Sequence, residues 1–355
     1  MTNPSKENEF WYYAHKGETL RELAGSTNNP TQIRRKAKKC FEEAIDLKPD
    51  NSWAIARCGL LDRQMGNLDK AEAAFENLKN DYPGNPWVFA QLGETYRLLF
   101  VRTSSTDPTD LLVKKAIENF EHAIDLYKKL NDQDEYLWAY AHLGATYLYI
   151  ENFDTALEYL EKAIDLAEDG YAWAWACKAK VYYDRKDFEK ADACIQTAKT
   201  LDRRVVPSAD FQRGLLAYLN GEPDRAIELF NRELQEDVDN TLALYGIALV
   251  TVRTKGVKEA KTEIDKAEAV LIEHKNNSEN QYMLAALAYL QNQTDQALKY
   301  IKSAIAATNS IQDIFQNSEV SESMNRVLAN VQSGNLSWLG LDFDEDFHNL
   351  ISQAK

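Results

Sequence analysis

Glycine and proline are scarce in this chain, with 14 and 8 occurrences in 355 residues. Both residues disfavour helix interiors, so their scarcity, together with the frequent Ala, Leu, Glu and Lys, favours helical structure. No uncharged apolar run reaches the ~18 residues that a membrane-spanning helix needs. The N-terminal stretch also lacks the apolar segment of a secretion signal. We therefore expect a cytoplasmic, helical protein with no membrane partner.

Cysteine is also rare, and the four thiols are far apart in the sequence, at Cys40, Cys58, Cys177 and Cys194. They form neither a CxxC pair nor a zinc-type spacing, so we predict reduced thiols packed between helices and no metal site. Basic residues are the minority: 41 Lys and Arg against 56 Asp and Glu give a net charge of −15. An acidic surface repels phosphate backbones, which argues against sequence-independent nucleic-acid binding.

Catalytic motifs are missing as well. The sequence contains no GxGxxG, Walker-type phosphate loop, HExxH or GxSxG. The five histidines are scattered without the spacing of metal ligands. The one dense basic run, RRKAKK at 34–39, is interpreted as a solvated helix face rather than a nucleic-acid patch. We predict that the protein is not an enzyme and needs no cofactor.

What the sequence does contain is an internal period. An Ala is followed four residues later by a large apolar residue and seven residues later by a small or apolar one, as in Ala71, Phe75 and Leu78. These offsets place the three side chains on one face of a helix. The triplets begin at Ala37, Ala71, Ala116, Ala156, Ala191, Ala226, Ala260 and Ala297. One departs from the pattern, because Glu233 stands at its third place.

A second helical pattern precedes most of the triplets. It has a small residue where two helices would cross, at Gly59, Gly93, Gly144, Ala179, Gly214 and Ala248. Polar turn pairs such as Gly66-Asn67 and Lys186-Asp187 separate the two helices. A helix–turn–helix unit of about 34 residues with this pattern resembles the tetratricopeptide repeat (TPR) family. The resemblance covers residues 34–307 and implies an all-α, right-handed superhelical solenoid of antiparallel helix pairs, with about seven to eight repeats.

The domain organisation follows from where the triplets begin and end. Residues 1–33 are expected to supply an N-terminal helix and loop, as the first helix of a degenerate repeat. Residues 34–307 form the predicted solenoid, with an insertion at 101–115 that either extends a helix or protrudes as a loop. Residues 308–355 lack the triplet and are expected to form capping helices, since solenoids need capped ends. The alternative for this tail is a docking or autoinhibitory segment.

Tryptophan recurs at one place of the repeat. Counting back six residues from the small residue of four successive repeats gives Trp53, Trp87, Trp138 and Trp173. The resemblance implies that this stripe of the first helix lines the concave surface of the superhelix. Two interpretations stay open: the indoles form one edge of a binding groove, or each is a strut that packs on the preceding repeat.

Polar and aromatic residues share the stripe with the indoles. Arginine can stack on tryptophan and pair with carboxylates, and tryptophan is enriched at binding hot spots. We therefore predict a partner-binding groove and no catalytic or metal-ligating residue. Besides the four tryptophans, its predicted members are Arg57, Arg63, Gln91, Glu94, Arg97, His142, Tyr149, Lys180 and Tyr183.

The sequence thus favours a non-catalytic interaction scaffold or adaptor that binds a peptide or protein segment in its concave groove. A second hypothesis is a regulatory protein whose acidic-aromatic tail, residues 336–351, occupies the groove until a partner displaces it. A third, an RNA-binding repeat protein, is disfavoured by the net charge. The identity of the partner and the formation of a homo-oligomer stay open.

Overall fold

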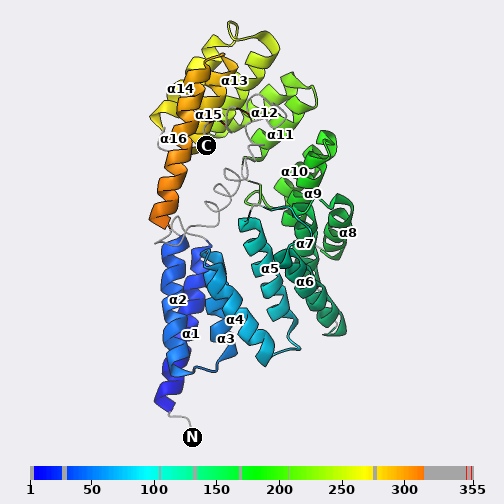
Figure 1. Cartoon of the computed structure of the whole chain (residues 1–355), viewed down its shortest axis with the longest axis vertical. Helices are drawn as coiled ribbons and strands as arrows, with labels where there is room; N and C mark the ends of the chain where they lie inside the picture. The colour runs from blue at the N-terminus through cyan, green and yellow to red at the C-terminus, as the bar shows by residue number, and fades with distance from the viewer. Residues whose placement is uncertain are drawn as a thin grey trace. The chain divides into compact units, whose positions relative to one another are not determined.

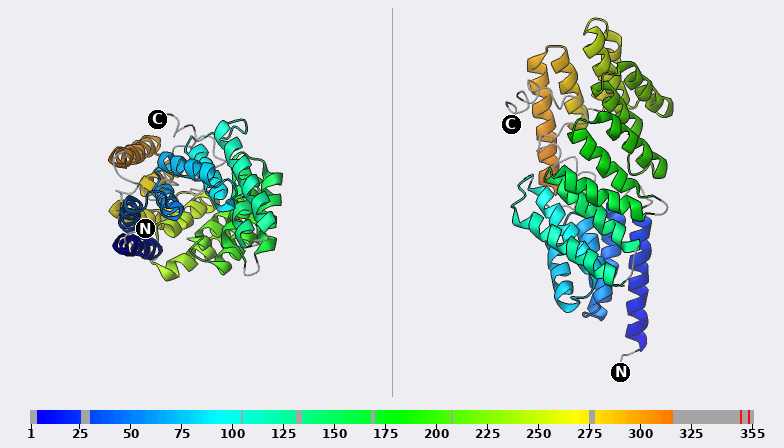
Figure 2. Two further views of the ribbon diagram at one scale, coloured as in Figure 1. Left: turned by 90° about the horizontal axis from the view of Figure 1, so that it is seen from below. Right: turned by 90° about the vertical axis from the view of Figure 1, so that its right-hand side faces the viewer.

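The computed structural model describes residues 4–25, 30–103, 105–130, 134–167, 170–206, 208–274 and 278–315, together with positions 349 and 353. These residues contain 16 α-helices and no strand. From α1 to α8 and again from α9 to α15, each helix packs against the next one along the chain (Figures 1 and 2). The predicted all-α solenoid of antiparallel helix pairs is confirmed.

The helices fall into two compact units, which join between α8 and α9. The first unit contains α1 (Pro4–Ala24), α2 (Pro30–Leu47), α3 (Ser52–Gln64), α4 (Leu68–Asp81), α5 (Pro86–Arg102), α6 (Leu111–Leu130), α7 (Asp134–Tyr149) and α8 (Phe153–Leu166). The second contains α9 (Ala172–Asp184), α10 (Phe188–Leu201), α11 (Ala209–Leu219), α12 (Pro223–Glu236), α13 (Thr241–Lys255), α14 (Lys261–Glu273), α15 (Ser278–Leu290) and α16 (Thr294–Phe315). Each odd-numbered helix and the next even-numbered one form one repeat.

The core of each repeat is built from the predicted triplets. Apart from Glu233, every triplet residue exposes at most 7% of its surface. The small residues of the first helices are needed because the second helix approaches them closely. A β-carbon added at Gly93 would lie 3.0 Å from the Phe120 ring, and one at Gly214 only 2.3 Å from the Phe230 ring. The large and small residues therefore interlock, as the alternation in the sequence predicts.

The turns inside the repeats adopt the left-handed backbone conformation. Gly66 and Gly221 have φ of 83° and 81°, which glycine tolerates without strain. Glu151 and Lys186 have φ of 59° and 61° at the same place, where a β-carbon costs about 1–2 kcal/mol. The predicted turn pairs are thereby confirmed.

The sequence left open whether the insertion at 101–115 extends a helix or protrudes as a loop. Helix α5 continues to Arg102, and a loop then leads to the start of α6 at Leu111. Carboxylates order the end of that loop: Asp107 accepts a hydrogen bond from the Thr109 amide at 2.8 Å, and Asp110 accepts one from the Leu112 amide at 2.7 Å. The second of these bonds caps the N-terminus of α6.

The N-terminal helix α1 pairs with α2 as a complete repeat. Phe10 is fully buried, and a β-carbon at Gly17 would lie 3.0 Å from the Phe41 ring. Trp11 and Leu23 expose 45% and 46% of their surfaces, because the face of α1 that carries Phe10 and Gly17 is the one turned towards α2.

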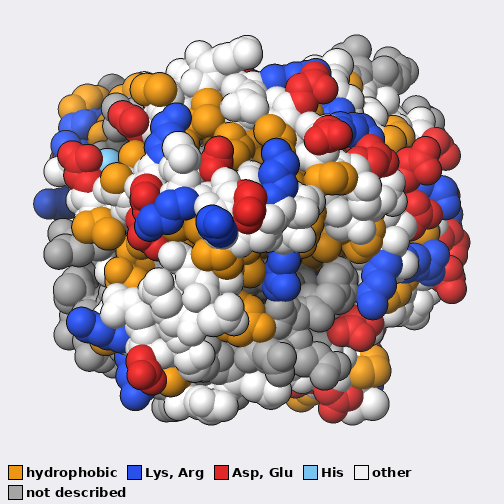
Figure 3. Space-filling model, turned by 90° about the horizontal axis from the view of Figure 1, so that it is seen from above, with side chains coloured by type: hydrophobic (Ala, Val, Ile, Leu, Met, Phe, Trp, Pro, Cys, Tyr) orange, Lys and Arg blue, Asp and Glu red, His pale blue; other side chains and the backbone are white. Residues whose placement is uncertain are grey.

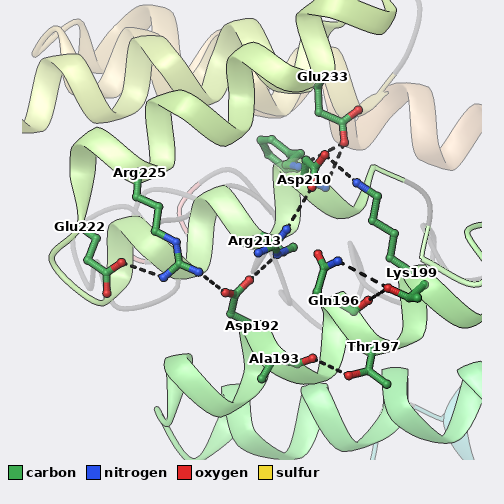
Figure 4. Close-up of polar contacts among 12 residues, drawn as sticks. Asp192, Ala193, Gln196, Thr197, Lys199, Asp210, Arg213, Glu222, Arg225 and Glu233 are labelled. Atoms are coloured by element: carbon green, nitrogen blue, oxygen red, sulfur yellow. Dashed lines mark hydrogen bonds and ion pairs between the residues drawn. The ribbon is translucent and has the colours of Figure 1, made fainter.

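A network of charged side chains joins three helices of the second unit (Figure 4). Asp192 of α10 accepts a hydrogen bond from Nε of Arg213 on α11 at 2.6 Å and also pairs with Arg225 of α12. Asp210 at the start of α11 pairs with Lys199 of α10 at 2.6 Å. Asp192 and Asp210 are both buried, so each carboxylate needs these partners to offset its loss of hydration.

Glu233, the departure from the triplet, caps a helix. Ser208 precedes α11 in the left-handed conformation, with φ of 51°, and its side chain makes no capping hydrogen bond. The Glu233 carboxylate of α12 accepts hydrogen bonds from the amides of Asp210 and Phe211 at 3.1 and 3.3 Å instead. It also places a negative charge at the positive end of the helix dipole. Glu233 is polar, unlike the third residue of the other triplets, because its side chain on α12 caps α11 in place of Ser208.

Several expectations fall partly or wholly outside the described residues. The tail predicted at 308–355 is described only as far as Phe315, apart from positions 349 and 353, so the segment 336–351 and the domain boundaries stay predictions. No disulfide joins any of the four cysteines, all of which lie in the described ranges. None of the helices in the described ranges combines the length and apolarity needed to cross a bilayer. Figure 3 shows a face on which acidic and basic side chains are interspersed with apolar ones.

We predict that Glu233→Ala lowers the free energy of unfolding of the second unit by about 1 kcal/mol, as expected for the loss of a helix N-cap. Urea unfolding gives the loss, and amide hydrogen exchange at Asp210 and Phe211 localises it to α11. Glu228→Ala on the same helix is the control, because its exposed pair with Arg232 contributes at most about 0.5 kcal/mol. Equal losses in both variants, or unchanged exchange at α11, would contradict the capping role.

Candidate functional site

Three of the predicted tryptophans lie in the first unit, near the starts of α3, α5 and α7. Each ring packs against the phenylalanine of the preceding second helix. The ring-centroid distances are 5.5 Å for Phe41–Trp53, 5.9 Å for Phe75–Trp87 and 6.2 Å for Phe120–Trp138. These contacts are the ones that the strut interpretation expects. Trp53 nevertheless exposes 36% of its surface and the other two are half-buried, so each strut also presents an accessible indole surface.

Trp11, which was not among the predicted residues, occupies the same place in its repeat, although its ring packs on Phe10 of its own helix at 5.0 Å. Gly17 faces Phe41 as Gly93 faces Phe120, so it marks the small-residue position of the first repeat. Counting back six residues from Gly17 gives Trp11, which is 45% exposed. The signal is present in the sequence, but the small residues were assigned only from Gly59 onwards. We call Trp11, Trp53, Trp87 and Trp138, on α1, α3, α5 and α7, the indole stripe.

A buried ionic cluster lies beside the stripe on α5 and α7. Glu94 exposes only 5% of its surface. Its two oxygens accept hydrogen bonds from Arg97 at 2.7 Å each, and Oε2 lies 2.7 Å from Nδ1 of His142. Bidentate pairing with arginine and a histidine contact offset much of the cost of burying this carboxylate.

The same arrangement recurs in the first repeats, on α1 and α3. Glu18 accepts hydrogen bonds from Arg21 at 3.0 and 2.8 Å, and Arg57 of α3 lies 3.3 Å from its carboxylate. Glu18 and Glu94 both follow the small residue of their repeat by one position, and both arginines come three residues later. We call these two groups the carboxylate clamps.

Each clamp also fixes an indole. Arg57 lies 5.4 Å from the centre of the Trp53 ring while it pairs with Glu18. His142 lies 4.0 Å from the Trp138 ring while it contacts Glu94. The side chain one turn after the indole therefore connects it to a carboxylate of the preceding first helix, which limits the freedom of the ring.

The clamp is missing at Trp87. Leu60 of α3 stands where Glu18 and Glu94 stand in their repeats, and Gln91 stands where Arg57 and His142 stand. Gln91 exposes 6% of its surface, and its side-chain oxygen has no hydrogen-bond partner among the described residues. The main-chain carbonyl of Gln91 is 3.4 Å from Arg63. Trp87 is thus the rung of the stripe that lacks carboxylate support.

Two further predicted residues of the first unit support this arrangement. The guanidinium of Arg63 lies 6.0 Å from the Trp138 ring. The Tyr149 hydroxyl donates to the carbonyl of Val101 at 3.2 Å, which ties α7 to the extended end of α5. Arg57 and Arg97 of the predicted groove already pair with carboxylates, so their charges are largely neutralised within the unit.

The remaining predicted residues lie on α9 of the second unit. Trp173 is half-buried, and its ring lies 6.2 Å from Tyr171. Lys180 pairs with Asp184 and lies 5.3 Å from the Tyr183 ring. Trp173 thus belongs to one local contact on α9, and Lys180 and Tyr183 belong to another. The contact of these residues with a partner stays a prediction.

Burial and charge shift the titration of the clamp on α5 and α7. Burial lowers the pKa of His142 below its usual value of 6.5, and the attraction of Glu94 offsets only part of this effect. Burial alone would raise the pKa of Glu94, but Arg97 and His142 hold it well below the usual 4.5. No group of acidic, histidine and cysteine side chains in the described ranges has the geometry of a metal site. The chemistry that this surface offers is aromatic contact.

We predict that acidification destabilises the first unit in two steps. The pKa of His142 is lowered by folding, so the unfolded state binds its proton first and stability falls as the pH drops below about 6.5. The pKa of Glu94 is also lowered, so a further loss follows below about 4.5. In urea unfolding at a series of pH values, His142→Gln should flatten the first step and Glu94→Gln the second. His122→Gln, on an exposed histidine of α6, is the control; an unchanged profile in the His142 variant would contradict the assignment.

Comparison with known proteins identifies the repeat. Tetratricopeptide-repeat family models match residues 34–51, 59–85, 113–169 and 177–240. The matched ranges include residues of all four tryptophan-bearing repeats that were predicted from the sequence, and they fall in both units.

Two curated proteins are similar to this chain. A probable UDP-N-acetylglucosamine–peptide N-acetylglucosaminyltransferase SPINDLY of Hordeum vulgare is 31% identical over 130 residues, which cover 36% of this chain and 13% of that protein. A TPR repeat-containing protein of Methanocaldococcus jannaschii is 20% identical over 303 residues, which cover 83% of this chain and 47% of that protein. The chain thus spans less than half the length of either relative.

Among solved structures, a thermophilic TPR protein of Thermus thermophilus is similar at 16% identity and a TM-score of 0.46, over 57% of this chain and 99% of that one. The family assignment depends on the repeat models and on the buried triplets that they share with the sequence pattern. The chain belongs to the tetratricopeptide-repeat family.

Proposed function

We propose that the first unit is a non-catalytic scaffold that binds an extended peptide or protein segment along its indole stripe. The observation that supports this proposal most directly is that the indoles are exposed and yet held by neighbouring rings. Trp11 and Trp53 expose 45% and 36% of their surfaces, although each belongs to an ordered aromatic contact. An exposed aromatic side chain that needs no ordering on binding is a typical hot-spot residue.

The physical reason is the shape and chemistry of the indole. A tryptophan buries a large apolar area on binding and brings an N–H donor, and only two torsion angles must be fixed. Packing against Phe41, Phe75 and Phe120 fixes much of that freedom before a partner arrives. Repetition at one register of successive helices would let a single extended segment contact several indoles.

Charge contributes less to the proposal than the sequence indicated. Arg57 and Arg97 pair with Glu18 and Glu94, so a partner's carboxylate would have to compete with internal ones. Gln91, Glu94 and His142 are buried, and we assign them the role of positioning the stripe rather than touching the partner. Trp173, Lys180 and Tyr183 are proposed as a second contact group, on α9.

The proposal includes no catalytic step. The similarity to the plant transferase covers 13% of that enzyme, which does not extend its activity to this chain. We also propose a reducing compartment such as the cytoplasm, because the four cysteines form no disulfide and no metal-type spacing. RNA binding is not favoured, since the net charge is −15.

We predict that peptides selected from a display library on the immobilised full chain bind through the stripe. Trp53→Ala combined with Trp138→Ala should weaken the selected peptides at least about tenfold, the loss expected for two hot-spot side chains. Each substitution alone should cost less than the loss of about 3–5 kcal/mol for a fully buried tryptophan, because both indoles are partly exposed where they pack on Phe41 and Phe120.

Tyr12→Ala is the matched control, because Tyr12 is 58% exposed on α1 but lies outside the stripe. Thermal unfolding must show that all variants fold. The proposal would be wrong if the double variant binds the selected peptides as tightly as the wild type, or if Tyr12→Ala weakens them equally.

A further inference from the structure

The N-terminal half of α2 carries the one dense run of positive charge in the sequence, at 34–39. Within this run, Arg35, Lys36 and Lys39 are exposed. Lys39 follows Lys36 by three positions and Arg35 by four, so the three side chains are neighbours on one side of the helix. We call these three residues the basic face of α2.

The cations of this run differ in whether the fold uses them. Nζ of Lys38 lies 2.5 Å from the buried carboxylate of Asp62 on α3, so this cation is part of the packing between the helices. Lys36 and Lys39 form no ion pair with any residue in the described ranges. The helix dipole stabilises cations at the C-terminal end of a helix, not in its N-terminal half. The two lysines therefore add nothing to the stability of α2 through charge.

Lys16 of α1 extends the positive charge onto the neighbouring helix. Its Nζ lies 3.4 Å from the Tyr12 hydroxyl. Burial raises the pKa of the Cys40 thiol, whereas the charges of Lys16 and Lys39 both lower it, so the two ammonium groups lie near the same sulfur. The one carboxylate that acts on this thiol is that of Glu43.

The other carboxylates around the basic face are paired or distant. Glu42 lies 3.6 Å from Lys38, and Glu22 of α1 lies 3.8 Å from Arg21. Asp46 is two helical turns beyond the basic run, about 10 Å along α2. The four cations on α1 and α2 thus have one adjacent carboxylate that is not paired elsewhere, in a protein whose net charge is −15.

The chain's own tail contains the matching charge. Residues 342–346 read DFDED, with four carboxylates in five positions, and lie outside the described ranges. The indole stripe suits this run less well, because Arg57 and Arg97 already pair with carboxylates. The 26 residues at 316–341 link the run to the end of α16. Such a link spans up to about 85 Å when extended, so it does not restrict which face the run reaches.

We infer that the acidic run 342–346 docks on the basic face of α2, with its carboxylates beside Lys16, Lys36 and Lys39. Five extended residues span about 16 Å, so the run lies within reach of these local cations. A long polyanion or an anionic membrane extends beyond the Debye length of about 8 Å and is repelled by the rest of the acidic surface. This docking goes beyond the proposed function, because it leaves the indole stripe to the partner.

The test measures the binding of a labelled synthetic peptide, residues 336–351, to the full chain by fluorescence anisotropy. In the wild type, the linked tail competes at an effective concentration in the millimolar range, so the peptide should bind weakly. A full-chain variant with Asp342→Asn, Asp344→Asn, Glu345→Gln and Asp346→Asn should bind it at least about tenfold more tightly. Lys36→Glu with Lys39→Glu in that variant should abolish the gain, and added salt should reduce it.

Lys128→Glu with Lys129→Glu, at two exposed lysines of α6, is the matched control and should leave the gain unchanged. Equally tight binding to the wild type and the tail variant would leave the face open to an acidic segment of another protein and overturn the inference. Absence of binding to both, or binding of phosphatidylserine vesicles through Lys36 and Lys39 in place of the peptide, would overturn it as well. A gain that vanishes on dilution of the wild type would assign the docked run to a second copy, against docking within one chain.

Discussion

The structure of the first unit depends on one contact, which three of its four repeats share: a phenylalanine of the second helix lies against a glycine of the first. The ring of Phe120 lies on Gly93, where a β-carbon would come within 3.0 Å of it. The same ring also touches Trp138 of the next repeat. Phe41 and Phe75 make the equivalent pair of contacts, with Gly17 and Trp53 and with Gly59 and Trp87. One side chain therefore closes a repeat and contacts the indole of the next, so that core packing and the proposed binding surface are coupled.

The indoles differ in the contacts that they make besides the one with phenylalanine. Carboxylates of the preceding first helix hold Trp53 and Trp138 through Arg57 and His142. Trp87 lacks this support and, together with Tyr82 and Tyr127, lines a surface hollow of about 550 Å³. A stripe with some rungs fixed and one left open can combine a rigid frame with a site of specificity. In the second unit, the charged network around Asp192 joins α10, α11 and α12, and Glu233 caps α11.

Much of the fold could be predicted because it depends on local patterns. The triplets, the small residues and the turn pairs repeat with fixed spacing, and each corresponds to one packing requirement. The pairing of Arg57 with Glu18 could not be predicted, because the two residues lie on different helices and 39 positions apart. Trp11 was overlooked for another reason: Gly17 lies 20 residues before Ala37, whereas Gly59 and Gly144 lie 12 residues before their triplets, so the spacing of the first repeat differs. The sequence places polar side chains on a stripe, but only the structure shows which of them already have partners.

The most direct test of this coupling is the affinity of library-selected peptides for Phe75→Leu. Leucine occupies the equivalent place at Leu160 against Gly144, so the repeat should still close at a cost of about 1 kcal/mol. Without the ring edge, the Trp87 indole loses its support, and peptide affinity should fall about as far as in Trp87→Ala. Unchanged affinity in Phe75→Leu, with Trp87→Ala still impaired, would show that the core ring does not position the indole and would contradict the account.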